Sequence, residues 1–121
     1  MKESHLIHVD SKLWLFFLRL QVVFRPNPAD KAHWNNEAGN LVFWVTPPAG
    51  WDVSQNLTTF PNPSQAVSTE PRDVEFEVRG PERSRAQAIT LPAYALFCVC
   101  EDVNGVCEYR RQELPITIAP H

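Results

Sequence analysis

The sequence has no long hydrophobic run. Its longest apolar stretch, Leu13 to Leu18, is followed by Arg19 and falls far short of the roughly 20 apolar residues that a membrane-spanning helix needs. The same stretch makes a poor secretory signal, because it is short, histidines and an aspartate precede it, and no small-residue cleavage site follows. We therefore expect no membrane insertion, and a protein that is cytoplasmic as given or one domain of a larger chain.

Clusters of basic residues are also missing. The net charge is −3, whereas surfaces that bind nucleic acid are normally rich in lysine and arginine. The sequence contains no Gly-x-Ser-x-Gly or His-Glu-x-x-His motif and no glycine-rich phosphate loop, which are the common signatures of hydrolytic and phosphate-binding sites. The sequence thus predicts no nucleic-acid partner and no cofactor, and it gives no support to hydrolytic catalysis.

Uninterrupted windows for a long helix are rare as well. The 121 residues include 11 prolines, spread from Pro26 to Pro120, and a proline inside a helix breaks it. Between the prolines lie short apolar runs bounded by turn residues, a pattern typical of antiparallel sandwiches and barrels. We predict an all-β, antiparallel β-sandwich of about seven strands over residues 13–121, preceded by a flexible lead-in at residues 1–12.

Several runs alternate between apolar and polar residues, as strands with one buried face do. In Asp73 to Arg79 we expect Val74, Phe76 and Val78 to face the core. Further strand segments are predicted at residues 13–25, 41–46, 51–53, 89–91, 94–100, 106–111 and 114–119. Residues 29–36 are expected to form a loop or a single helical turn, in which Trp34 plugs one end of the sandwich and His33 is a surface or packing residue. Residues 60–72 form the longest irregular stretch.

All three cysteines lie in one stretch, Tyr94 to Arg111. An apolar run leads to a polar tip that ends in Asn104-Gly105, and both of these residues tolerate the positive φ of a tight turn. Folding this hairpin places Cys100 and Cys107 directly opposite each other or one register step apart. Directly opposite residues have Cβ atoms about 4.5–5.5 Å apart, close to disulfide reach, whereas a diagonal pair lies about 7 Å apart.

Three cysteines are an odd number, which fits a reactive pair better than a fully paired disulfide scaffold. Cys98 shares a strand face with Cys100 and is the thiol left over. Two other interpretations stay open. The cysteines could simply fill the core, since free cysteine is often buried. Alternatively, three thiolates could hold Cu(I) or Zn(II), but this would require Cys98 and Cys100 to turn toward Cys107.

Thiol exchange requires a thiolate that a partner can reach. Arg110 and Arg111 would favour ionisation of a nearby thiol. In contrast, the neighbouring acidic residues Glu101, Asp102 and Glu108 would raise its pKa. This acidic surround predicts a slow thiol unless a partner or a conformational change intervenes.

Three segments of the sequence resemble a known group of redox domains. They are residues 32–51, 68–79 and 94–118. In the last segment, Cys100 and Cys107 flank an acidic tip that contains glycine, one on each side. Together they resemble the N-terminal, immunoglobulin-like domain of the DsbD thiol-disulfide interchange proteins. More closely still, they are similar to the β-sandwich domain at the C-terminus of some bacterial thioredoxin-like and NHL-repeat proteins.

This resemblance implies an immunoglobulin-like sandwich with a redox function. In the DsbD domain, which is periplasmic, two hairpin cysteines accept electrons from a membrane partner and pass them to thioredoxin-like proteins under a cap loop. The resemblance assigns these catalytic roles to Cys100 and Cys107, places the cap loop at residues 60–71, and implies a thioredoxin-like protein or domain as the partner. The alternative that we retain is a non-catalytic interaction module of a thioredoxin-like or NHL-repeat system.

Overall fold

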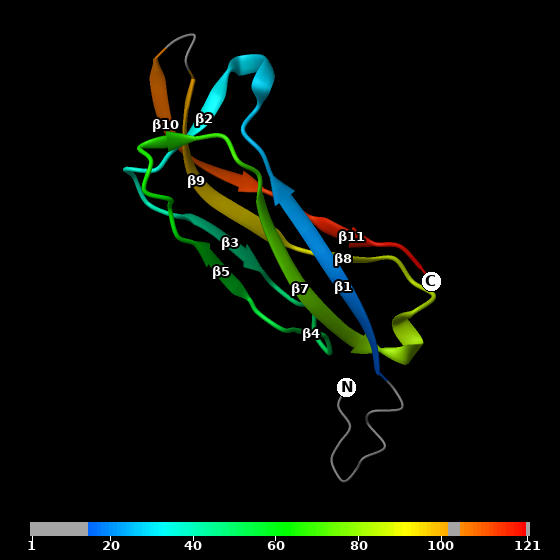
Figure 1. Ribbon diagram of the computed structural model, residues 1–121. Coiled ribbons are helices and arrows are strands. Elements are labelled where there is room, and N and C mark those ends of the chain that lie inside the picture. Colours follow the sequence, from blue (N-terminus) through cyan, green and yellow to red (C-terminus); the bar gives the residue numbers. More distant parts are fainter. Residues whose placement is uncertain (1–14, 102–104, 121) are drawn as a thin grey trace.

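The described part of the chain consists of strands, connecting loops and two short 3-10 helices (Figure 1). The computed structural model describes residues 15–101 and 105–120, so the predicted lead-in at residues 1–12 lies outside it. The strands are β1 Leu15–Phe24, β2 Ala32–Asn35, β3 Leu41–Val45, β4 Asp52–Val53, β5 Leu57–Phe60, β6 Val67–Ser68, β7 Arg72–Pro81, β8 Ile89–Leu91, β9 Ala93–Glu101, β10 Val106–Glu113 and β11 Ile116–Ile118. The 3-10 helices are η2 Pro28–Asp30 and η3 Glu82–Ser84.

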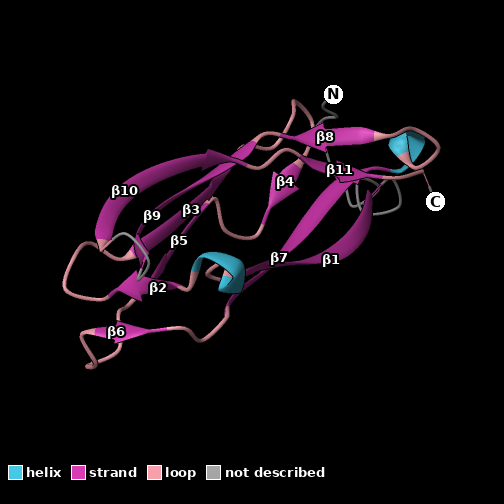
Figure 2. Ribbon diagram, turned by 90° about the horizontal axis from the view of Figure 1, so that it is seen from above, coloured by secondary structure: helices cyan, strands magenta, loops and turns pink. Residues whose placement is uncertain are grey.

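The strands form three antiparallel sheets, which confirms the predicted all-β sandwich class. One sheet has the order β1-β7-β4. The six-stranded sheet has the order β5-β3-β9-β2-β6, with β10 added to β9, and a third sheet pairs β11 with β8. Figure 2 shows β1 and β7 side by side, apart from the layer that contains β3, β5, β9 and β10.

The core lies between these layers and follows the predicted alternation. In β7, Val74, Phe76 and Val78 are buried while the glutamates between them are exposed. Phe43 of β3 sits at the centre, with its ring centroid 5.8 Å from that of Phe24 and 5.9 Å from that of Phe76. The remaining buried core residues are Trp34, Leu41, Val45, Trp51, Leu91, Ala93, Ala95 and Ile118.

The cysteine hairpin is longer than predicted. The pairing of β9 with β10 continues, in the same register, into the pairing of β8 with β11. Glu113 lies opposite Tyr94 and Ile116 lies opposite Leu91, so Pro92 and Pro115 occupy facing positions between them. Proline has no backbone N–H to donate to a strand ladder. The hairpin therefore leaves the six-stranded sheet at this point and continues as the two-stranded sheet.

Residues 29–36 differ from the prediction of a loop or single helical turn. Only Pro28–Asp30 form a helical turn, and Ala32–Asn35 form strand β2, which pairs with both β9 and β6. Four residues carry too little alternation to identify a strand, and β2 owes its conformation to pairing with segments far away in the sequence. Trp34, which was expected to plug one end of the sandwich, is 3% exposed and belongs to the core.

Candidate functional site

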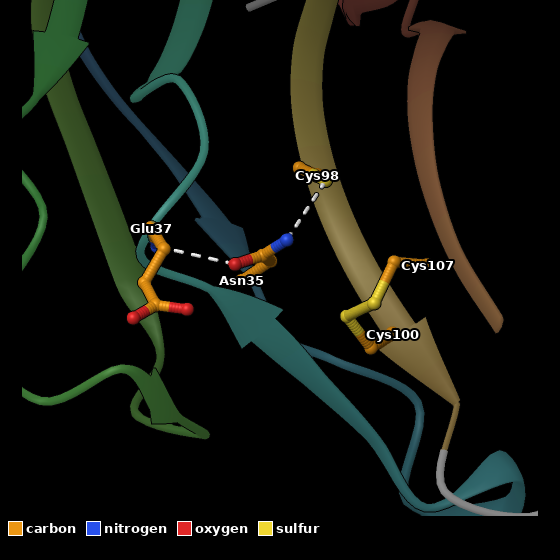
Figure 3. The surroundings of a disulfide bond; sticks show 5 residues. All are labelled: Asn35, Glu37, Cys98, Cys100 and Cys107. Atoms are coloured by element: carbon orange, nitrogen blue, oxygen red, sulfur yellow. Dashed lines mark hydrogen bonds between the residues drawn. A yellow bond between two sulfur atoms is a disulfide. The ribbon is translucent and has the colours of Figure 1, made fainter. Parts of the chain in front are cut away.

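A disulfide joins Cys100 and Cys107 across the hairpin (Figure 3). The two residues are directly opposite each other in the register of β9 and β10, with Cα atoms 3.9 Å apart and sulfurs bonded at 1.98 Å. Gly105 has φ of 63° and donates its N–H to the carbonyl oxygen of Glu101 at 2.8 Å, which closes the turn. The rest of the predicted tip, residues 102–104, lies outside the described residues. Of the two predicted registers, the structure has the directly opposed one.

The two halves of the disulfide differ in exposure. Cys100 is 7% exposed on β9, which is flanked by β10 on one side and by β2 and β3 on the other. Cys107 is exposed on β10, and so are all the other residues of that strand. Among the described residues, β10 pairs only with β9, so it is an edge strand. A molecule that approaches the disulfide from solvent therefore meets it on the Cys107 side.

The disulfide lies on the outer face of the six-stranded sheet and not in the core. Side chains alternate between the two faces of a strand. In β9, Ala93 and Ala95 face the core, so Cys98 and Cys100 face outward. Cys100 is also absent from the core cluster, although it is buried. Core filling, the first alternative for the cysteine pair, therefore does not account for the exposed Cys107, while Cys100 is a buried residue outside the main core cluster.

Strand β2 completes this outer face with two polar side chains. His33 is directly opposite Cys100, and Asn35, two residues further on, donates a hydrogen bond from Nδ2 to the Cys98 sulfur at 3.7 Å. On the other side of β9, Tyr109 is directly opposite Cys98. The sequence prediction missed the contribution of β2. The polar-apolar-polar order of His33, Trp34 and Asn35 is consistent with a strand but is too short to predict one.

Glu101, Glu108 and Arg110 project to the opposite face of the sheet from the disulfide. Glu101, Glu108 and Arg110 line a small cavity of about 180 Å³ on the inner side of β10, together with core-side residues such as Phe97. The hydrogen bond to Glu108 raises the pKa of Arg110 above its usual value. Arg111 is on the outer face, but it forms an ion pair with Glu113 at 2.7 Å. The predicted balance of acidic and basic residues around the thiols therefore does not describe the outer face, and Asp102 lies outside the described residues.

Residues 60–71, expected by resemblance to form a cap loop, are mostly loop and contain one two-residue strand, β6, at the edge of the six-stranded sheet. Their strand β6 pairs with β2, and β2 separates it from β9 and the disulfide. Arg72, at the start of β7, holds this segment through an ion pair with Glu70 at 2.9 Å. Burial tends to raise the pKa of Glu70, but hydrogen bonds from Ser68 and Arg72 outweigh it and lower the pKa below its usual value.

In the ranges 15–101 and 105–120, no group of three or more His, Cys, Asp or Glu side chains is arranged to hold a metal ion. Within the same ranges, no helix is both long and apolar enough to span a membrane.

Comparison with protein-family models found no match, and searches of curated proteins and of solved structures found none either.

Proposed function

We propose that the protein is a thiol-disulfide exchange domain that acts with a thioredoxin-like dithiol partner. The observation that carries this proposal is the unequal exposure of one cross-strand disulfide. Cys107 stands on an exposed edge strand, while Cys100 is almost fully buried on the central strand behind it. This arrangement offers one sulfur to an attacking thiolate and keeps the other as the leaving group.

The exchange proceeds in two steps. A thiolate of the partner attacks Sγ of Cys107, the Cys100–Cys107 bond breaks, and its electron pair leaves on Cys100, which takes a proton from solvent. The second thiolate of the partner then attacks the partner's own sulfur in the mixed disulfide and releases Cys107 as a thiolate. The partner dithiol is thereby oxidised to a disulfide, and Cys100 and Cys107 are reduced. The reverse sequence oxidises them again.

The pairing of β9 with β10 should allow the Cys100–Cys107 disulfide to re-form after reduction. Cys100 and Cys107 are paired residues within an eight-residue ladder between β9 and β10. The remaining ladder bonds do not depend on the disulfide, so they keep the two thiols opposite each other after reduction. Reclosure then requires little chain movement, which lowers its entropic cost.

The test uses a reduced thioredoxin as the probe and counts thiols by alkylation and mass spectrometry. We expect the wild-type protein to change from one alkylated cysteine, Cys98, to three. A thioredoxin variant that lacks its second thiol should be trapped as a mixed disulfide on Cys107. Cleavage after Glu101 separates Cys107 from the other two cysteines, so the peptide map identifies the linked residue. Cys98→Ser serves as the control, and its disulfide should also be reduced, which changes it from no alkylated cysteine to two.

Two results would contradict the proposal. One is a disulfide that stays closed under conditions in which the same thioredoxin reduces an exposed reference disulfide. The other is a mixed disulfide located on Cys100, because attack there would mean that the exposed edge is not the point of entry.

The alternative function, a non-catalytic interaction module, is supported by a different observation. The outer face that carries the disulfide also displays apolar side chains, of which Tyr109 is 62% and Leu57 is 48% exposed. Between them lie the partly exposed Val42, Trp44 and Leu96. Scattered apolar residues on a surface are ordinary, whereas a continuous apolar patch is typical of an interaction site.

The double variant C100S/C107S separates the two functions. If the domain is a docking module, this variant should bind a thioredoxin-like protein with the affinity of the wild type, and Leu57→Glu should weaken binding at least about tenfold, since burying an unpaired charge is costly. Titration calorimetry measures both. Binding that disappears with the cysteines, or binding that is indifferent to Leu57→Glu, would count against the module.

A further inference from the structure

A third sulfur lies beside the disulfide. Cys98 is a free, partly exposed thiol on β9, two residues before Cys100, so both project from the same outer face. Its directly opposite residue on β10 is Tyr109, which makes Cys107 its diagonal neighbour. Diagonal neighbours on one sheet face have Cα atoms about 7–8 Å apart and Cβ atoms somewhat closer.

Asn35 holds the Cys98 sulfur in this position (Figure 3). The side-chain oxygen of Asn35 accepts a hydrogen bond from the backbone N–H of Glu37 at 3.1 Å. A backbone N–H can only donate, so the oxygen of the Asn35 amide must face Glu37 and the NH₂ group must face Cys98. The sulfur at 3.7 Å from that NH₂ group is thus an acceptor, a role that both a thiol and a thiolate can fill.

Of the two sulfurs in the disulfide, Cys107 is the one that Cys98 could join. A bond to Cys100 would link two residues of one strand whose Cα atoms are about 6.6 Å apart at the usual rise and whose Cβ atoms point the same way, beyond the usual Cβ separation of about 3.5–4.5 Å. A bond to Cys107 would join two strands, and β10 is the exposed edge strand. Among the described residues beyond Cys107 toward the turn, Val106 pairs with β9, opposite Glu101. The diagonal bond requires backbone movement, because bridged Cα atoms are usually no more than about 6.8 Å apart, and we expect the Cys107 end of this edge strand to make that movement.

We propose that Cys98 exchanges with the disulfide, so that the protein has two disulfide states, Cys100–Cys107 and Cys98–Cys107. The Cys98 thiol loses its proton to water, and the resulting thiolate attacks Sγ of Cys107. The bond to Cys100 breaks and Cys100 leaves as a thiolate, which is then protonated. One thiol and one disulfide are present before and after, so the step needs no oxidant or reductant.

This exchange would regulate the proposed thiol-disulfide exchange, because it changes which thiol is free. Its regulatory role therefore rests on the proposed function. In the first state the free thiol is the partly exposed Cys98 beside Asn35. In the second state it is Cys100, which is 7% exposed in the present structure. The chemical step itself involves no partner, so it can be tested on the protein alone.

The first experiment uses wild-type protein alone, with no added thiol and no thioredoxin. After equilibration, free thiols are blocked with N-ethylmaleimide, the chain is cleaved after Glu101, and fragmentation at Val99 shows whether Cys98 or Cys100 carries the label. We expect the label to shift in part from Cys98 to Cys100. Label that remains wholly on Cys98 overturns the inference, whatever the thioredoxin experiment shows.

The second experiment compares Cys100→Ser with Cys107→Ser. Each variant keeps two thiols and is oxidised with diamide at low protein concentration, and the monomer is then alkylated. We expect Cys100→Ser to lose both alkylation sites through a Cys98–Cys107 bond, and Cys107→Ser to keep both. If the monomer of Cys100→Ser keeps both thiols, or if the two variants behave alike, Cys98 does not take over Cys107.

Discussion

Replacing Arg72 with methionine should lower the free energy of unfolding by about 3 kcal/mol, a large share of the stability of a domain of this size. Arg72 is only 5% exposed, although it carries a permanent charge. Its guanidinium donates hydrogen bonds to the carboxylate of Glu70 at 2.9 Å and to the side-chain oxygen of Asn36 at 2.8 Å. It also lies 4.5 Å above the centre of the Trp34 ring.

The loss is expected to be large because these contacts join separate segments. Asn36 follows β2, Glu70 follows β6, and Arg72 begins β7. Hydrogen bonds that involve a charged group contribute about 1.5–3 kcal/mol each, and a cation above an aromatic ring adds about 0.5–2 kcal/mol. Methionine recovers part of this sum by filling the space, but it leaves the oxygen of Asn36 without its donor.

Urea denaturation measures the change, and Arg19→Met is the matched control. Arg19 forms an ion pair with Glu77 at 3.0 Å, almost as short as that of Arg72, but the two side chains are 70% and 48% exposed. Exposed pairs contribute about 0–1 kcal/mol, so the control should change little. Equal losses in the two variants would show that burial of Arg72 does not matter, contrary to our argument.

Gly80→Ala should destabilise the protein by up to about 3 kcal/mol. Gly80 is buried near the end of β7, where the ring of Trp51 packs directly on its backbone. A Cβ atom at this position would lie 2.7 Å from two carbon atoms of that ring. Trp51 is itself 9% exposed and part of the core, so its ring has little room to retreat. The added methyl group therefore displaces the indole or the strand.

Gly39→Ala is the control for this substitution. No atom lies within 4 Å of the corresponding Cβ position, and Gly39 does not have the positive φ that favours glycine. Its replacement should change the unfolding free energy by less than about 1 kcal/mol, in either direction. A thermal scan of both variants is sufficient. Similar melting temperatures would mean that Trp51 accommodates the methyl group and that the packing at Gly80 is loose.

The parts of the fold that could be predicted are those in which local pattern and burial agree. The alternation of Val74, Phe76 and Val78 identified β7 because one face of that strand meets the core along its whole length. Strand β2 could not be identified in this way, because its strand conformation depends on pairing with β9 and β6. The continuation of the hairpin past Pro92 and Pro115 was also hidden, since each proline by itself indicates the end of a strand.

At the candidate site, the turn residues were enough to predict the cysteine pair, but the residues that surround the pair in space could not be predicted. Asn104-Gly105 between two apolar runs was enough to bring Cys100 and Cys107 together, and the structure joins them. Sequence proximity also suggested that Glu108 and Arg110 would act on the thiols, but strand alternation puts both on the other face, beside the small cavity. His33 and Asn35 reach the cysteines only because β2 adds to β9, a long-range pairing that one sequence does not reveal.

The edge strand that exposes Cys107 also bears on how the protein behaves at high concentration. An unpaired strand edge can recruit the same edge of another molecule and start aggregation, and charged side chains along the edge oppose this. Strand β10 carries two glutamates and two arginines, joined in Glu108–Arg110 and Arg111–Glu113 ion pairs along the strand. Stacking of a second copy would have to strip water from these groups. The strand can thus present a sulfur to solvent while resisting the growth of fibrous assemblies.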